Sequence, residues 1–200
     1  MAVGELSIRR AGPDDAVAIA ALYAPFVATS QATFEEVAPD AAEVARRISG
    51  GGIDYPWLVA EEDGRLLGYA SSGCFRQRSA YRWAVETGVY VAEAAQRRGV
   101  ARALMARLID ALVEAGFVTA IASISLPNAA SAGLHEALGY ALVGTIRAPG
   151  YKLGAWVDIG YWQRDLAERA VPPSEPGAFV AKNGTGPHRV DWLKVRGTFS

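Results

Sequence analysis

The chain has 200 residues, of which 51% are apolar, and a net charge of −1, which suits one globular domain with a sizeable core. This balance and a pI near 6.1 exclude a global basic field that would attract nucleic acid or an anionic membrane. The single cysteine, Cys74, cannot form an intramolecular disulfide, and Met1–Arg10 lacks the apolar core of a signal peptide. We therefore expect a cytoplasmic protein with no membrane-spanning segment.

The first third of the chain predicts a strand, two helices and a hairpin. Pro13 and the acids after it are typical of a helix start. Glu62-Asp63-Gly64 between two apolar runs is a hairpin signal. The expected elements are a strand at Leu6–Arg9, helices at Pro13–Val27 and Pro39–Ile48, and strands at Trp57–Glu61 and Leu66–Ala70.

The remainder predicts alternating strands and helices and then an irregular tail. Leu104, Leu108 and Leu112 repeat every four positions, which indicates an amphipathic helix that begins at Val100 and stops at Gly116. After Leu166 the chain is rich in proline and glycine, so we expect residues 169–200 to be flexible or docked through Trp192-Leu193. The other expected elements are strands at Ala84–Val91, Thr119–Ser125, Ala141–Arg147 and Trp156–Leu166, and a helix at Asn128–Leu138.

The loop Gln96-Arg-Arg-Gly-Val-Ala101 places cations where a helix begins. Arg97, Arg98 and Arg102 lie at this end, although a helix N-terminus carries partial positive charge and prefers acids. Their presence makes sense if a polyanion binds the free N–H groups of the first turn. Gly99 would let the backbone approach that anion closely. The loop therefore predicts a pyrophosphate site.

Gly88 interrupts a strand that is otherwise made of Val, Tyr and Thr. Glycine in such a position often marks a bulge, and a bulge here would separate two neighbouring strands. An extended ligand could then hydrogen-bond main-chain groups of Val89 and Val91. Coenzyme A, which is long and flexible with a pyrophosphate at one end, fits this description better than a mononucleotide.

Three segments together resemble the acetyl-CoA motifs of the GNAT N-acetyltransferase superfamily: Val89-Tyr-Val91, Gln96–Ala101, and Asn128…Ser131…His135-Glu-Ala-Leu-Gly-Tyr140. Within that superfamily, Arg78–Glu86, Leu126-Pro-Asn128 and Gly150–Asp158 resemble phosphinothricin N-acetyltransferases. The resemblance covers Leu6–Leu166 and is sparse at Gln31–Asp54. It implies the GNAT acyl-CoA N-acyltransferase fold, a mixed α/β domain at residues 1–168 with a mostly antiparallel twisted sheet flanked by helices.

The resemblance also implies an activity. Acetyl would pass directly from acetyl-CoA to the α-amino group of a small amino-acid-like acceptor, such as phosphinothricin or methionine sulfoximine, in a ternary complex. In relatives the closing hairpin lies at a subunit interface, so we expect a homodimer. Two alternatives remain: a GNAT enzyme that acetylates a protein N-terminus or another amine, and a non-catalytic acetyl-CoA sensor. With His135, His188 and one cysteine, the chain offers no metal-ligand cluster, and we expect no metal.

Two residues are candidates for proton transfer. Glu86 is the candidate general base, because a substrate ammonium must lose a proton before it can attack. The alternative is a structural carboxylate paired with Arg82 or Arg78 at a sheet edge. His135 stands where many superfamily members have a tyrosine that protonates the departing CoA thiolate, and a histidine can donate the same proton. The alternative for His135 is a hydrogen-bonded structural residue.

The remaining candidates are binding residues. Arg76 and Arg78 could hold acceptor anions through forked hydrogen bonds, unless they belong to a solvated loop. Asn128 can serve as a helix N-cap and contact the pantetheine arm as well. The acceptor set is Phe34, Arg76, Arg78, Tyr81 and Val85, where Phe34 is alternatively core. The cofactor set is Val89, Tyr90, Val91, Gln96, Arg97, Arg98, Gly99, Val100, Ala101, Asn128 and Ser131.

Overall fold

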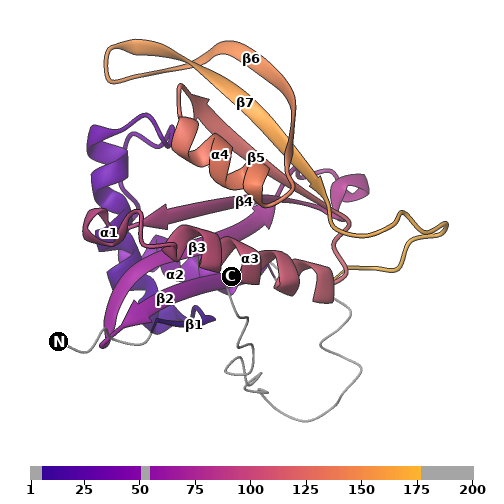
Figure 1. The fold of residues 1–200 in the computed structure, drawn as a ribbon, viewed down its shortest axis with the longest axis horizontal. Helices are drawn as coiled ribbons and strands as arrows, with labels where there is room; N and C mark the ends of the chain where they lie inside the picture. The colour runs from indigo at the N-terminus through magenta and orange to yellow at the C-terminus, as the bar shows by residue number, and fades with distance from the viewer. Residues whose placement is uncertain (1–5, 51–54, 177–200) are drawn as a thin grey trace.

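A computed structural model describes residues 6–50 and 55–176 and shows a mixed sheet with helices on both faces (Figure 1). The strands are β1 (Ser7–Arg10), β2 (Trp57–Glu62), β3 (Arg65–Cys74), β4 (Ala84–Val91), β5 (Thr119–Leu126), β6 (Ala141–Lys152) and β7 (Ala155–Asp165). The helices are α1 (Ala16–Thr29), α2 (Ala41–Ser49), α3 (Val100–Glu114) and α4 (Ala129–Ala137). No helix in these ranges is long and apolar enough to cross a membrane.

The seven strands form one sheet in the order β1-β2-β3-β4-β5-β7-β6. Among the described strands, only β4 and β5 pair in parallel, because α3 carries the chain back across the sheet between them. The other neighbours pair antiparallel, in agreement with the mostly antiparallel sheet that the resemblance implies. The chain order of strands and helices also matches the prediction element by element.

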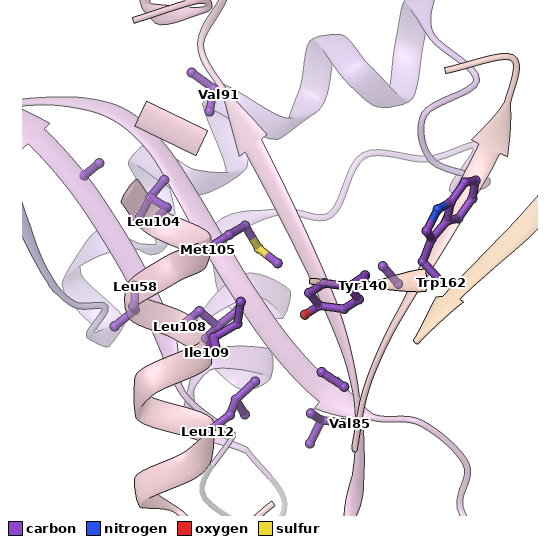
Figure 2. Packing of buried hydrophobic residues seen from close by; sticks show 14 of the residues in the cluster. Leu58, Val85, Val91, Leu104, Met105, Leu108, Ile109, Leu112, Tyr140 and Trp162 are labelled. Carbon is purple, nitrogen blue, oxygen red and sulfur yellow. The ribbon is translucent and has the colours of Figure 1, made fainter. Parts of the chain in front are cut away.

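Two apolar clusters fix the layers. The larger lies between the sheet and α3, and it includes Leu104, Leu108 and Leu112, none of which is exposed. Figure 2 shows these α3 side chains directed at the sheet, with Tyr140 beside β4. The smaller cluster packs α1 and α2 on the opposite face, around Val59 and Tyr69. The predicted four-residue repeat of α3 is therefore its buried stripe.

Most element boundaries differ from the predicted ones by a few residues, for local reasons. Pro13–Asp15 forms a short 3-10 turn before α1 rather than its first turn. Helix α2 begins at Ala41 and not at Pro39, because the Asp40 side chain caps it by accepting a hydrogen bond from the Glu43 N–H at 2.8 Å. Strand β6 continues to Lys152, five residues beyond the predicted end, across an irregular stretch between Ile146 and Gly150.

Strands β4 and β5 separate after Glu86, but no bulge lies at Gly88. The two strands pair only from Ala84↔Thr119 to Glu86↔Ile121, whereas β3 and β4 stay in register as far as Val91. The predicted bulge is therefore wrong, and the predicted gap is present for another reason. The Thr87 hydroxyl donates a hydrogen bond to the Ile121 carbonyl at 3.2 Å and lies 3.1 Å from the Tyr140 hydroxyl. Side-chain hydroxyls therefore take the place of the next backbone hydrogen bonds between β4 and β5.

Residues 169–176, the described start of the predicted tail, return to the domain. Figure 1 shows this segment leaving β7 and turning back toward the C-terminal end of α3. A Cβ added at Gly116 would lie 3.7 Å from Pro176 Cα, so the two backbones are in contact. The predicted docking residues Trp192-Leu193 lie outside the described residues.

Candidate active site

The loop before α3 exposes an uncapped helix start. Gly99 is the N-cap residue, with φ +82°, and it has no side chain to bond the amides of the first turn. Arg97 also has positive φ, +58°, which is uncommon for a residue with a Cβ. The loop therefore presents main-chain N–H groups at the positive end of α3, an arrangement that suits a phosphate.

The three arginines at the start of α3 differ in their contacts. Arg98 forms an ion pair with Glu62 of β2 at 2.7 Å, so part of its charge is already neutralised. Arg97 and Arg102 are exposed. The Glu62 carboxylate thus binds an arginine and not the helix amides, which leaves the amides of the first turn accessible to an anion.

The gap between β4 and β5 is lined by main-chain groups of alternate β4 residues. The Trp83 carbonyl accepts from the Val118 N–H at 2.9 Å, while the Ala92 N–H donates to Leu67 of β3 at 2.8 Å. Because main-chain groups alternate in direction along a strand, those of Val89 and Val91 face the gap. These are the two residues that the sequence predicts to bind an extended ligand.

Tyr90 has a different role from its neighbours. Its main chain faces β3, and its ring packs edge-on against Tyr23 at 4.8 Å and Phe26 at 5.1 Å. This burial raises the pKa of the Tyr90 hydroxyl. The Tyr90 side chain holds α1 against β4, so within the predicted Val89–Val91 motif it is a packing residue.

Glu86 lies on the α1–α2 face of the sheet, at the last β4–β5 pair before the gap. Its carboxylate accepts a hydrogen bond from the Ser123 hydroxyl at 2.5 Å. The predicted alternative partner Arg82 instead forms an ion pair with Glu175 at 2.6 Å. Next on the same face is Gly88, where an added Cβ would meet no atom closer than 3.9 Å. A small side chain would therefore fit at Gly88 without a clash, in van der Waals contact with Ser71 and Tyr90.

Ser123 is a site residue that the sequence analysis missed. It follows Ile121, the partner of Glu86, by two residues, so both share the face of β5 that Glu86 adjoins. A signal was available, because Thr119, Ser123 and Ser125 alternate with the buried Ala120, Ala122 and Ile124. Polar residues on alternate positions of a central strand indicate a hydrated or ligand-lined face.

A cavity of about 240 Å³ lies between the end of α1 and the end of β5. Gln31 and Ala32 form one wall, and Ser125 and Asn128 belong to the other. The Asn128 side-chain oxygen accepts from the Ser131 N–H at 3.0 Å, which confirms the predicted N-cap of α4. The Asn128 side-chain NH₂ is a separate group and remains suited to a ligand that enters this cavity.

His135 is buried, with 2% of its surface exposed. Its Nδ1 lies 2.8 Å from the Ser131 carbonyl, which can only accept, so Nδ1 carries the hydrogen of the neutral ring. Among the described residues Nε2 has no hydrogen-bond partner, and its lone pair is therefore uncommitted. Burial lowers the pKa of His135, against a smaller opposing effect of the Ser131 carbonyl. The neutral form therefore prevails at pH 7.

This burial predicts a stability change in mild acid. The folded protein binds a proton at His135 less readily than the unfolded chain does, so the free energy of unfolding falls as pH drops through the ordinary histidine pKa of about 6.5. His135→Gln removes this contribution. We expect urea denaturation to show a smaller loss of stability between pH 7.5 and pH 5 in the variant than in the wild type. An equal loss in both proteins would contradict this account.

The predicted acceptor residues fall into separate groups. A Cβ at Gly150 would clash with the Phe34 ring, so Phe34 packs directly on β6 while remaining 37% exposed. The same loop is fixed by Lys152, whose buried ammonium donates to the Thr33 carbonyl at 2.8 Å. Phe34 is thus held between the α1–α2 loop and the closing hairpin, and it keeps an open surface.

The β3–β4 loop carries the other acceptor candidates. The Arg76 guanidinium stacks on the Phe75 ring at 4.2 Å, and Phe75 packs edge-on against Tyr81 at 5.9 Å. Arg76, Arg78 and Tyr81 are exposed. Val85 differs, because it is fully buried in the core on the α3 face, opposite Glu86. We therefore correct the predicted acceptor set by removing the Val85 side chain.

Comparison with known proteins identifies this arrangement. The family model for the acetyltransferase (GNAT) domain matches residues 8–160. The chain belongs to the GNAT acetyltransferase family. It is 40% identical over 168 residues to a phosphinothricin N-acetyltransferase of Streptomyces viridochromogenes, covering 84% of this chain and 91% of the relative. It is 37% identical to an L-methionine sulfoximine/L-methionine sulfone acetyltransferase of Salmonella typhimurium, covering 84% and 98% of the two chains.

Solved structures of GNAT acetyltransferases have the same fold. A Salmonella typhimurium acetyltransferase, yncA, solved with its cofactor acetyl-CoA, superimposes with a TM-score of 0.80 at 35% identity, covering 84% of this chain and 98% of that one. A phosphinothricin acetyltransferase of Sinorhizobium meliloti in complex with acetyl-CoA gives 0.76 at 34% identity, covering 94% and 97%. The chain is thus an N-acetyltransferase of the phosphinothricin acetyltransferase type.

Proposed function

We propose that this GNAT enzyme transfers acetyl from acetyl-CoA to the α-amino group of a small amino-acid-like acceptor, such as phosphinothricin or methionine sulfoximine. The observation that carries the proposal is the position of the Glu86 carboxylate. It lies at the last β4–β5 pair, on the same face as Gly88, which has no side chain, and next to strand edges that can hold an extended ligand. The activities of the two named relatives support the choice of acceptor.

Acetyl-CoA would supply the thioester that reacts. The main-chain N–H groups at the start of α3 suit its pyrophosphate, with Arg97 and Arg98 beside them and Gln96, Gly99, Val100 and Ala101 completing the loop. Main-chain groups of Val89 and Val91 suit the pantetheine arm along the gap. Asn128 and Ser131, at the start of α4, lie at the end of β5 that lines the same gap. In this proposal acetyl-CoA would run from the start of α3, along the gap between β4 and β5, to Glu86.

In this mechanism Glu86 takes a proton from the acceptor ammonium, directly or through a water, and the free amine attacks the thioester carbonyl. The Ser123 hydroxyl orients the Glu86 carboxylate by donating to it. After the attack the acceptor nitrogen carries a second acidic proton, and the C–S bond to coenzyme A breaks as the amide forms. His135 Nε2, which carries no hydrogen in the neutral ring, would take up this second proton and pass it to the departing thiolate, so His135 acts as a relay rather than a stored acid.

The exposed Arg76 and Arg78 would bind the anionic groups of the acceptor, while Tyr81 and Phe34 supply walls. Guanidinium forks match carboxylate and tetrahedral acid oxygens well. Both arginines are in the loop that directly precedes β4, so they approach the Glu86 end of that strand.

A thiol-release assay tests the proposal against its alternatives. Acetyl-CoA is offered with phosphinothricin, methionine sulfoximine, ordinary amino acids and N-terminal peptides. We expect turnover on the first two and on some amino acids, and none on peptides. Turnover on peptides alone would show a protein N-terminal acetyltransferase. Binding of acetyl-CoA with no turnover on any amine would show a sensor module.

We also propose that the protein is a homodimer through the closing hairpin. Strand β6 is a sheet edge, and it and the start of β7 expose Leu142, Ile146, Tyr151 and Trp156, the last with 67% of its surface accessible. Unpaired strand edges with apolar side chains are covered in stable proteins. We expect sedimentation velocity to give a dimer, and Trp156→Asp to shift it toward monomer. A monomeric wild type at micromolar concentration would contradict the proposal.

A further inference from the structure

The β3–β4 loop, residues 75–83, has a shape that its own residues define. Ser79–Tyr81 forms a 3-10 turn, in which the Tyr81 N–H donates to the Arg78 carbonyl at 3.0 Å. The Tyr81 ring packs edge-on against the Phe75 ring at 5.9 Å. These contacts lie within the loop, so they do not fix its orientation relative to the sheet.

Contacts with the C-terminal segment, residues 169–176, supply that orientation. Arg82 donates two hydrogen bonds of 2.6 Å to the two Glu175 oxygens, in the bidentate form. The Trp83 indole N–H donates to the Ser174 carbonyl at 2.7 Å, and the Arg82 guanidinium stacks on the Trp83 ring at 3.7 Å. In the part of the chain that the structure describes, no other side chain of residues 75–82 hydrogen-bonds outside the loop. Bidentate geometry and stacking distinguish this contact from an ordinary exposed ion pair.

Apolar packing between the loop and the C-terminal segment is incomplete. A cavity of about 270 Å³ lies between them, with Ala80 and Tyr81 on one side and Ala170 and Pro173 on the other. Apolar side chains gain dispersion energy only where their atoms touch, and the cavity interrupts that contact. The polar contacts of the loop's last two residues are therefore its principal attachment to the segment.

The proposed base does not depend on this attachment. Glu86 is paired in register with Gly73 of β3 and with Ile121 of β5, so the sheet holds its main chain on both sides. Arg82 lies outside β4, which begins at Ala84. A change at Arg82 should thus alter the orientation of the loop and leave the base in place.

We infer that Arg82 is a positioning residue, which with Glu175 clamps the β3–β4 loop to the C-terminal segment. This clamp fixes the three candidate acceptor-binding side chains of the loop, Arg76, Arg78 and Tyr81, relative to β4. The inference rests on the proposed function, because it assumes that this loop binds the acceptor. The C-terminal segment then contributes to acceptor affinity without touching the reacting atoms.

Arg82→Gln tests the clamp, because an amide cannot form the bidentate pair. We expect KM to rise about 5- to 20-fold for the wild type's best amino-acid-like acceptor in the thiol-release assay, since binding must then also order the loop. The kcat value and the Kd for acetyl-CoA should stay within about 2-fold, because Glu86 and the α3 loop are unchanged. Arg169→Gln is the matched control. It removes an ion pair of 2.6 Å with Asp165 that does not reach the β3–β4 loop, and it should alter none of these values.

An exchange of charges distinguishes the clamp from a local effect of Arg82. Arg82→Glu places two carboxylates together, and Glu175→Arg places two guanidinium groups together, so each single variant should raise the acceptor KM. The double variant restores opposite charges at positions 93 residues apart, and its KM should be at least about 3-fold below that of either single variant. Both side chains are partly exposed, so we expect all three variants to fold, which thermal denaturation checks.

The outcomes separate the clamp from the transferase activity. If the wild type acetylates an amino-acid-like acceptor and Arg82→Gln keeps the wild-type KM, the clamp is wrong and the proposed function stands. A KM increase in both single charge variants without recovery in the double variant would also overturn the clamp. If the wild type acetylates no amino-acid-like acceptor, the proposed function is wrong and the clamp with it. A KM increase that the double variant reverses, with kcat retained, establishes the clamp.

Discussion

Glu86→Gln is expected to lower kcat by about 10²- to 10⁴-fold, the usual contribution of a positioned general base. The amide keeps the size of the side chain and can still bond Ser123, but it cannot take a proton from the acceptor. Because Glu86 touches neither the α3 loop nor the strand edge at Val89 and Val91, the Kd for acetyl-CoA should stay within about 2-fold. Steady-state kinetics and calorimetry measure the two quantities independently.

Glu114→Gln is the matched control for that variant, since Glu114 is exposed at the end of α3. It should leave kcat unchanged. Near-normal turnover in Glu86→Gln would show that another group, or bulk water, removes the proton. A large loss of acetyl-CoA affinity would instead assign Glu86 a binding role, and the proposed mechanism would fail at its first step.

Gly99→Val is expected to raise the Kd for acetyl-CoA by about 10- to 100-fold, or roughly 1.4–2.8 kcal/mol. A β-branched side chain at φ +82° is strained, and it stands at the N-terminal end of α3, where the pyrophosphate is proposed to bind. No protein atom lies within 4 Å of an added Cβ there, so the valine would not clash with the protein itself. A loss of affinity would therefore come from a clash with the bound pyrophosphate or from a change in the loop conformation. Calorimetric titration measures it directly.

Gly154→Val separates strain from ligand contact. Gly154 has φ +80° and equally open surroundings, but it lies in the β6–β7 turn. Its replacement should cost stability and leave acetyl-CoA affinity unchanged. Equal acetyl-CoA affinities for Gly99→Val and the wild type would show that the pyrophosphate does not bind at the start of α3. That result would contradict the interpretation of the arginine-rich loop.

Patterns within one element predicted the fold well. The four-residue repeat of α3 gave its buried face, and strand β4 has the predicted bounds, Ala84–Val91. Where predictions missed, the deciding contact was local but not visible in the pattern, as with the Asp40 cap that begins α2 at Ala41. The extension of β6 to Lys152 depends on pairing with β7, and a single strand's composition does not show its partner.

The sequence predicted the positions of the candidate site residues within their elements better than it predicted their contacts. It placed Glu86 and Gly88 on one face of β4 and the arginine-rich loop directly before α3, and the structure has the same arrangement. The sequence assigned Glu86 an alternative partner in Arg82, which instead binds Glu175, and it missed Ser123. It also placed Val85 at the acceptor, although Val85 points into the core. Alternation shows which residues share a face, but it does not show which residues from distant segments meet there.

The sequence by itself determined the order of elements, the uncapped glycine start of α3 and the carboxylate on β4, because each depends on residues a few positions apart. The tertiary structure alone decided how the gap between β4 and β5 opens. There the Thr87 hydroxyl, and not a bulge, ends the ladder. It also decided the tautomer of His135 and the return of residues 169–176 to Arg82 and Trp83. These features join groups far apart in the chain, and long-range contacts form only when the whole core packs.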